Sequence, residues 1–368
     1  MLFTVYILFF SVVNTFFKIK NRERFYFITV IGLSLLSFTI NPTREMDLYT
    51  HYKTLDFMRT SSLESVLAMK YVQYDGLPVY AIFFYFISKL GNNKLLLAIT
   101  YIVDYGCQFK ILSMAREDFN LSKDGERWAY NMILLLTNVL ALTGVRNMLA
   151  FSLCALMIYY DLVRRKYRLL SITIYILMCL FHESVVTIVG FRIFVELINL
   201  KIFNSIKVFI IFWPCLLNFV LKCLNLIEDN TFFNKLSQKV MIYTSVGNDY
   251  RALGGDLGLL QIYLELGIVI FILIISFFQR KSVIKKSKYY QFFLVVSFFC
   301  LGCSVLPQIL VRYISFCIFL VTPLYAESFK IRLFNRNFYL VSFCHVAIVS
   351  AIIIGFINLV YSQYSILP

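Results

Sequence analysis

Arg146 and His182 are the residues whose types and spacing point most directly to chemistry. Arg146 precedes an apolar run from Met148 to Val163, and His182 ends the next apolar run, beyond the basic turn Arg164 to Arg168. If both runs are helical, Arg146 lies about 30 Å and His182 about 24 Å from the middle of that turn, at about 1.5 Å per residue. Both side chains are therefore expected at one membrane face, where ionisable groups indicate a functional site.

Arginine side chains supply the expected anion-binding chemistry. A guanidinium presents a rigid fork of donors that matches phosphate oxygens, so a lipid diphosphate is a natural ligand for Arg146. The alternative for Arg146 is snorkelling to lipid headgroups. Arg312 opens an inward-going span and is expected at the same outer face. Arg251 would be a third external guanidinium, for which the alternative is a solvated loop charge.

His182 and Asp47 are the candidate proton-handling groups. A neutral imidazole can accept a proton from an attacking hydroxyl, and Glu183 could orient it, although adjacent helical residues point about 100° apart. A purely structural His182 is the alternative. Asp47 sits beside a membrane face, where a carboxylate needs an arginine or a substrate hydroxyl as partner. The other histidines are expected to be a loop residue, His51, and a packing residue in the last span, His345.

Tyrosines accompany these groups in the first long loop. Tyr49 and Tyr52 follow Asp47 at helical spacing, and Tyr74 and Asp75 precede a glycine further along. A tyrosine offers a flat apolar face with a polar edge, which suits a sugar ring. The alternative is an aromatic belt at the membrane interface.

Composition places these residues in a membrane protein. Of the 368 residues, 60% are hydrophobic and only 15% are charged, which excludes an ordinary globular enzyme. The net charge of +15 comes from Lys and Arg gathered in short loops between apolar runs, as orientation signals are, so no nucleic acid is expected as a partner. The first run, Met1 to Phe17, lacks a basic region and a cleavage site and is predicted to be a retained span with its N-terminus outside.

The pattern of apolar runs predicts an all-α, polytopic membrane protein with about twelve spans. The basic stretches then all fall on the cytoplasmic side, as the positive-inside rule requires. We expect a single transmembrane domain, 1–368, with an outer loop at 41–94 and a second outer loop at 223–256. Leu77 to Leu90 is too short to cross and is predicted to be a re-entrant or interfacial segment of the first loop. The predicted spans are 1–17, 25–40, 95–114, 128–143, 147–163, 169–182, 185–200, 206–222, 257–278, 289–306, 309–327 and 338–360.

The sequence predicts no cofactor and requires no metal site, and a divalent cation bound by Asp47 remains the alternative. A phosphate-binding glycine-rich loop and a dinucleotide fingerprint are both missing, which disfavours an ATP-driven pump or a nucleotide-sugar enzyme. The Cys300 and Cys303 pair has no second pair or nearby histidine to complete a zinc site. A packing role is expected for the cysteines inside apolar runs: Cys107, Cys154, Cys179, Cys215, Cys317 and Cys344.

An ordered set of short motifs resembles the EpsG-like branch of the Wzy-type polysaccharide polymerases. In the motif Val145-Arg146-Asn147 the family usually has a glutamine where this chain has Asn147. The matching motifs cover most of the chain and are Asp47-x-Tyr49-x-x-Tyr52, Tyr74-Asp75-Gly76, Val145-Arg146-Asn147, Phe181-His182-Glu183-Ser184 and Arg312-Tyr313.

The resemblance implies a multi-pass glycosyltransferase of a bacterial-type cell membrane, similar to C-type glycosyltransferases. Such an enzyme joins polyprenyl-diphosphate-linked oligosaccharide repeat units into capsule, exopolysaccharide or O-antigen chains on the outer leaflet. Its expected partners are that lipid-linked substrate, the bilayer, a flippase and a chain-length regulator. Arg146, Arg312 and Arg251 would hold the diphosphate, and His182 would either deprotonate the acceptor hydroxyl or help to hold the diphosphate.

Two other functions remain open from the sequence. A flippase for the same lipid-linked unit could pass a diphosphate along cavity arginines. A membrane sugar acyltransferase would also use a histidine, but would take its acyl donor from the cytoplasmic side. The clustering of charges towards one face favours the enzyme over the transporter.

Overall fold

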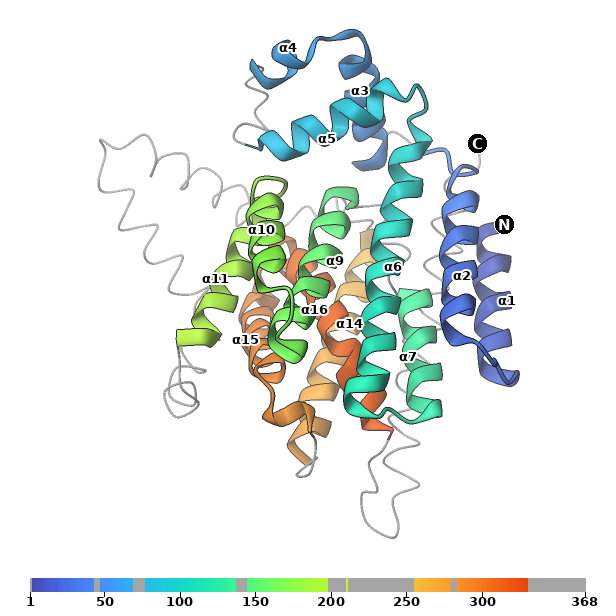
Figure 1. Ribbon diagram of the computed structural model, residues 1–368, viewed down its shortest axis with the longest axis vertical. Helices are drawn as coiled ribbons and strands as arrows, with labels where there is room; N and C mark the ends of the chain where they lie inside the picture. Colours follow the sequence, from blue (N-terminus) through green and yellow to red (C-terminus); the bar gives the residue numbers. More distant parts are fainter. Residues whose placement is uncertain are drawn as a thin grey trace.

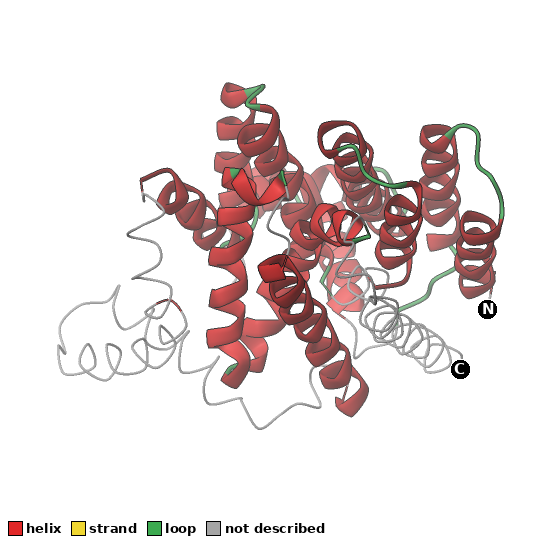
Figure 2. Ribbon diagram, turned by 90° about the horizontal axis from the view of Figure 1, so that it is seen from below, coloured by secondary structure: helices red, strands yellow, loops and turns green. Residues whose placement is uncertain are grey.

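The computed structural model describes residues 2–42, 47–68, 77–136, 144–197, 210, 255–278 and 283–329. Regular structure in these ranges is helical, without strands, so the predicted all-α class is confirmed for them. Figure 2, which looks up from below Figure 1, shows the helices joined by short loops.

Ten helices run side by side as a bundle in the described part of the chain (Figure 1). Apolar side chains pack between neighbouring helices, and further apolar side chains face outwards, where lipid covers them in a membrane. The bundle consists of α1 (Leu2–Phe16), α2 (Arg22–Ser37), α6 (Lys94–Phe119), α7 (Lys123–Leu136), α9 (Val145–Tyr159), α10 (Arg168–Cys179), α11 (Ser184–Leu197), α14 (Gly255–Phe278), α15 (Lys288–Gly302) and α16 (Pro307–Ser328).

Three further helices lie across one end of the bundle: α3 (Asp47–Thr60), α4 (Leu63–Ala68) and α5 (Pro78–Lys89) (Figure 1). Arg59 ties α3 to α5, because its Nε donates to the Ser88 carbonyl at 3.2 Å and its own carbonyl accepts from Lys89 Nζ at 2.8 Å. Helix α5 has 12 residues. It is therefore about 18 Å long, less than a bilayer core of about 30 Å. That this segment is re-entrant or interfacial stays a prediction.

Within the described residues, three helical stretches are long and apolar enough to cross a membrane, namely 94–119, 145–164 and 309–328. Shorter apolar helices there occupy 2–16, 78–89, 168–179, 262–276 and 288–302. Apart from residue 210, the spans predicted at 206–222 and 338–360 lie outside the described residues, so the twelve-span count stays a prediction.

The turn between α9 and α10 fixes the hairpin that carries Arg146 and His182. Helix α9 continues into a π-helical turn, Tyr160–Arg164, and the chain then reverses through Arg165 at a positive φ of 52°. Arg164 holds this turn against the end of α6, with its Nε donating to Asp118 at 2.8 Å and its Nη2 to Glu117 at 2.7 Å. The two antiparallel helices return to the bundle end that α3 and α5 cover (Figure 1).

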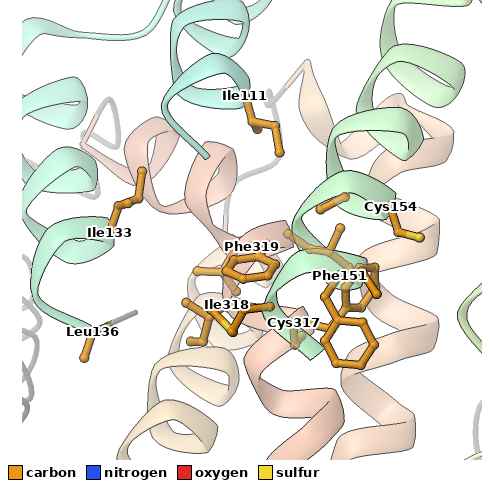
Figure 3. Close-up of a cluster of buried hydrophobic side chains, with 14 of the residues drawn as sticks. Ile111, Ile133, Leu136, Phe151, Cys154, Cys317, Ile318 and Phe319 are labelled. Atoms are coloured by element: carbon orange, nitrogen blue, oxygen red, sulfur yellow. The ribbon is translucent and has the colours of Figure 1, made fainter. Parts of the chain in front are cut away.

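Aromatic and branched side chains pack the centre of the bundle. Phe151 of α9 is fully buried, and its ring centroid lies 5.5 Å from that of Phe316 of α16. Figure 3 shows Phe151 and Cys154 of α9 on one side of this cluster, Ile133 and Leu136 of α7 on the other, and Cys317, Ile318 and Phe319 of α16 between them. This packing positions the starts of α9 and α16, where Arg146 and Arg312 lie.

A buried carboxylate joins α1, α2 and α6 to α7. Glu126 accepts a hydrogen bond from the Tyr26 hydroxyl at 2.7 Å and from Arg116 Nη1 at 3.2 Å, and Arg22 Nε lies 3.8 Å from its other oxygen. Arg22 in turn donates to Asn14 of α1 at 2.6 Å. The side chain of Glu126 is only 5% exposed, so its charge is compensated by these partners and not by water.

Replacing Glu126 by alanine is expected to lower the free energy of unfolding by about 3 kcal/mol, because two arginines then lose their buried counter-charge. Unfolding of the purified protein in detergent, followed by circular dichroism, measures this. Glu64→Ala on the exposed surface of α4 is the control and should unfold like the wild type. An equal stability of the Glu126 and Glu64 variants would contradict the structural role of this network.

Candidate functional site

Four polar residues named from the sequence meet at the covered end of the bundle. They are Asp47 at the start of α3, Arg146 in the first turn of α9, His182 between α10 and α11, and Arg312 near the start of α16. Both arginines act electrostatically on Asp47 and on His182. These four side chains, called the polar cluster below, therefore come together from elements far apart in the sequence.

Asp47 presents a carboxylate that is held ionised. Its Oδ2 accepts a hydrogen bond from His51 Nε2 at 3.1 Å, one turn along α3. Burial alone would raise the pKa of Asp47, but the hydrogen bond and charge of His51 and the charges of Arg146 and Arg312 outweigh it. The pKa of Asp47 is accordingly lowered below its ordinary value.

His51 differs from its expected place in a loop. It lies within α3, is fully buried, and packs edge-on against Phe84 at 5.2 Å between ring centroids. The helix begins at Asp47, so residues four apart face the same side and His51 becomes the partner of the carboxylate. That prediction was wrong, and the spacing of Asp47 and His51 was the signal that could have found the pair.

Arg146 lies over the face of an aromatic ring. Its guanidinium carbon is 5.3 Å from the ring centroid of Tyr80, a fully buried residue of α5. The Tyr80 ring is 4.1 Å from that of Phe84, which also packs against His51. The short helix α5 thus connects both sides of the polar cluster and covers it with aromatic rings.

The hydrogen bonding of His182 determines which ring nitrogen carries the proton. Its Nδ1 accepts a hydrogen bond from the Ser184 backbone N–H at 3.2 Å, and the Tyr313 hydroxyl donates to the Ser184 carbonyl at 3.4 Å. In a neutral imidazole one nitrogen accepts and the other carries the proton. The proton of neutral His182 is therefore on Nε2, and the ring offers a donor there.

His182 is neutral at physiological pH. The residue is 5% exposed and lies in the turn beyond the end of α10. Burial, followed by the charges of Arg146 and Arg312, lowers the pKa of His182 to about 3, and Asp47 opposes this shift only in part. A ring with this pKa gains no proton between pH 5 and 8, so its contribution is that of a neutral hydrogen-bond donor.

The remaining candidates either have contacts of their own or lie outside the described residues. Tyr49 packs under the Lys53 ammonium at 5.5 Å, and Tyr52 accepts a hydrogen bond from Asn93 at its backbone carbonyl. Glu183 is exposed, and the hydrogen bond that orients His182 comes from its neighbour Ser184. The residues named from the sequence that lie outside the described ranges are Tyr74, Asp75 and Arg251.

Three residues that shape the cluster had no role predicted from the sequence. Ser184 and Tyr313 belong to recognised motifs, but the backbone N–H of Ser184 donates to His182 only in the local turn, and the Tyr313 bond to Ser184 depends on a contact across the bundle. Tyr80 had no signal at all, since one tyrosine in an apolar helix resembles any other. Within the described ranges no group of three His, Cys, Asp or Glu side chains is close enough to hold a metal ion.

The chain has no detectable similarity to known proteins, so the function is inferred from the geometry of the site. No family model, no curated protein and no solved structure matches the chain. The cluster itself combines two guanidinium groups, an N–H donor and a carboxylate within an aromatic wall. The first three suit an anion, and the carboxylate suits a hydroxyl group.

Proposed function

We propose that this protein is a membrane glycosyltransferase that polymerises polyprenyl-diphosphate-linked oligosaccharide units at the outer leaflet of a cell membrane. The observation that carries the proposal is the convergence of Arg146, Arg312 and His182 with Asp47 at one end of an apolar helical bundle. The ordered motifs shared with the EpsG-like polymerases support the same activity. Capsule, exopolysaccharide and O-antigen chains are the candidate products.

The donor diphosphate is assigned to the two arginines and His182. A diphosphate carries several negative oxygens, and two guanidinium groups together with the Nε2–H of His182 offer donors to more than one of them. Apolar rings, including Phe151 at 6.0 Å from the His182 ring, keep the surroundings of low polarity. Electrostatic stabilisation of a leaving group is strongest in such a site.

The acceptor sugar is assigned to Asp47. In the proposed reaction the acceptor hydroxyl oxygen forms a bond to the anomeric carbon of the donor, while the bond from that carbon to the diphosphate oxygen breaks. The bonding electrons leave with the polyprenyl diphosphate. The hydroxyl proton passes to the Asp47 carboxylate and from there to water. Asp47 fits this task because it is an acceptor-only group held in its ionised form.

With Asp47 as the proton acceptor, His182 is left to bind the diphosphate and not to act as the general base. A general base needs a free lone pair towards the substrate, whereas the Nδ1 lone pair of His182 already accepts from Ser184. His182 is therefore proposed to hold the diphosphate. Tyr49 and Tyr52 of α3 remain proposed contacts of the substrate, and so do Glu183, Tyr74 and Asp75. Arg251 remains a proposed third guanidinium for the diphosphate.

Incubation of the purified protein in detergent with one defined lipid-linked repeat unit tests the proposal. A ladder of products, each longer by one unit, is the expected result on a gel. Failure to lengthen the unit, combined with its transfer across the membrane of proteoliposomes, would replace the enzyme by the flippase. Transfer of an acyl group from a cytoplasmic donor to the sugar would replace it by the acyltransferase.

A further inference from the structure

Helix α6 contains a polar pair that the proposed function does not use. Asp104 is fully buried and Gln108, one helical turn later, is 1% exposed. The Gln108 amide donates from Nε2 to Asp104 Oδ1 at 2.8 Å. The other two oxygens, Asp104 Oδ2 and Gln108 Oε1, are buried acceptors for which the described part of the chain supplies no hydrogen-bond donor.

Within the described ranges, no positive charge acts on Asp104 of this pair. Tyr101 and Tyr105 interact electrostatically with one another, and Tyr101 with Asp104, while Cys107 of the same helix also lies within electrostatic reach of the carboxyl. Across the interface, Cys154 of α9 is the titratable neighbour of Cys107. None of these groups is a cation, and the side-chain hydrogen bond that Asp104 accepts among the described residues comes from Gln108.

A second buried acid shows how this protein compensates a charge elsewhere. Glu126 is 4% exposed and has Arg116 at 3.2 Å and Arg22 at 3.8 Å. Asp104 has the same low exposure but an amide in place of the arginines, and it lies near the middle of a helix long and apolar enough to cross a membrane. An ionised carboxylate in that position costs several kcal/mol, which a bound cation removes.

We propose that Asp104 and Gln108 form a buried binding site for a single proton within α6. A proton on Asp104 Oδ2 neutralises the carboxyl and converts one acceptor that has no donor into a donor. The Gln108 amide continues to donate from Nε2 to the other carboxyl oxygen, Asp104 Oδ1. The proton and not a metal ion fits the site, because a sodium ion would need several further oxygen ligands beyond this pair.

The site gives the bundle a dependence on pH that is separate from catalysis. The proton binds while α6 is packed, and water admitted by unpacking would favour the ionised carboxylate. By linkage, a group that is protonated when folded and ionised when unfolded stabilises the folded protein less and less as the pH rises. Asp104→Asn, a neutral analogue of the protonated acid, is expected to remove this part of the pH dependence.

Carbodiimide labelling tests the proposal directly. Dicyclohexylcarbodiimide takes the proton of a buried carboxylic acid on nitrogen and bonds the carboxyl oxygen to its central carbon, so the whole reagent is added without a leaving group. Labelling at Asp104, mapped by peptide mass spectrometry on the intact detergent-solubilised protein, should be fast at acid pH and slow as the pH rises. Glu126, which is buried but paired with arginines, is the internal control and should stay unlabelled.

Unfolding measured across the same pH range makes the result decisive. The free energy of unfolding of the wild type should decline with rising pH more steeply than that of the Asp104→Asn protein. In the labelling experiment, replacing choline chloride by sodium chloride should not protect Asp104 from the reagent. Identical pH dependence in the two proteins would overturn the proposal. Protection by sodium would also overturn it, because the bound cation would then be a metal ion. Neither measurement requires polymerase activity, so both outcomes are independent of the proposed function.

Discussion

Alanine at Arg146 or at Arg312 is expected to lower the rate of polymer formation at least about 100-fold, the usual cost of removing one donor from a preorganised anion site. Both guanidinium groups act on Asp47 and on His182. In the proposed reaction each would stabilise the charge that develops on the departing diphosphate. Product ladders from purified protein and one lipid-linked unit measure the effect. Lysine at either position should recover only part of the rate, because it keeps the charge and loses the two-pronged donor.

A double variant sharpens this expectation. If both arginines hold the same diphosphate, Arg146→Ala combined with Arg312→Ala should cost less than the two single losses together, since groups acting as a unit are not additive. Arg24→Ala is the matched control, because Arg24 is an exposed arginine at the start of α2. Full-length polymer from either single variant, made at normal levels and with normal thermal stability, would remove the arginines from the proposed mechanism.

The sequence predicted the polar cluster to the extent that helix geometry decides it. The lengths of the two apolar runs and the basic turn between them were enough to bring Arg146 and His182 to one end of a hairpin, and in the structure the charge of Arg146 acts on His182. The apolar run predicted at 309–327 likewise placed Arg312 near the start of a helix, and α16 begins at Pro307. These are local properties of single helices.

Contacts between helices were beyond such reasoning. The position of Tyr80 under Arg146 depends on how α5 lies across the bundle, and that depends on Arg59 and its partners on neighbouring helices. The buried place of His51 follows from the same packing, which turns one side of α3 towards Phe84. Periodicity shows which residues share a helical face, but it does not show which helix that face meets.

The Nε2–H tautomer of His182 predicts how substitutions of this residue change the rate of polymerisation. His182→Ala is expected to lower the polymerisation rate about 100-fold to 1000-fold, because a donor to the diphosphate is lost. His182→Gln should recover much of that loss, since its amide can place an N–H near the position of Nε2. A general base would behave differently, because neither glutamine nor alanine can accept a proton, and the two variants would then be equally inactive.

The pH profile gives an independent test of the same assignment. Because the pKa of His182 is lowered to about 3, the wild-type rate should show no ionisation of this residue near its ordinary value of 6.5. The same lowered pKa makes the stability of the fold depend on pH. Below pH 6.5 the unfolded protein takes up a proton on His182 and the folded protein does not, so the free energy of unfolding falls as the pH drops from 6.5 towards 3. His182→Gln protein should lack that decline. A wild-type rate that falls below pH 6.5, together with equal inactivity of the glutamine and alanine variants, would make His182 the base and return Asp47 to a positioning role.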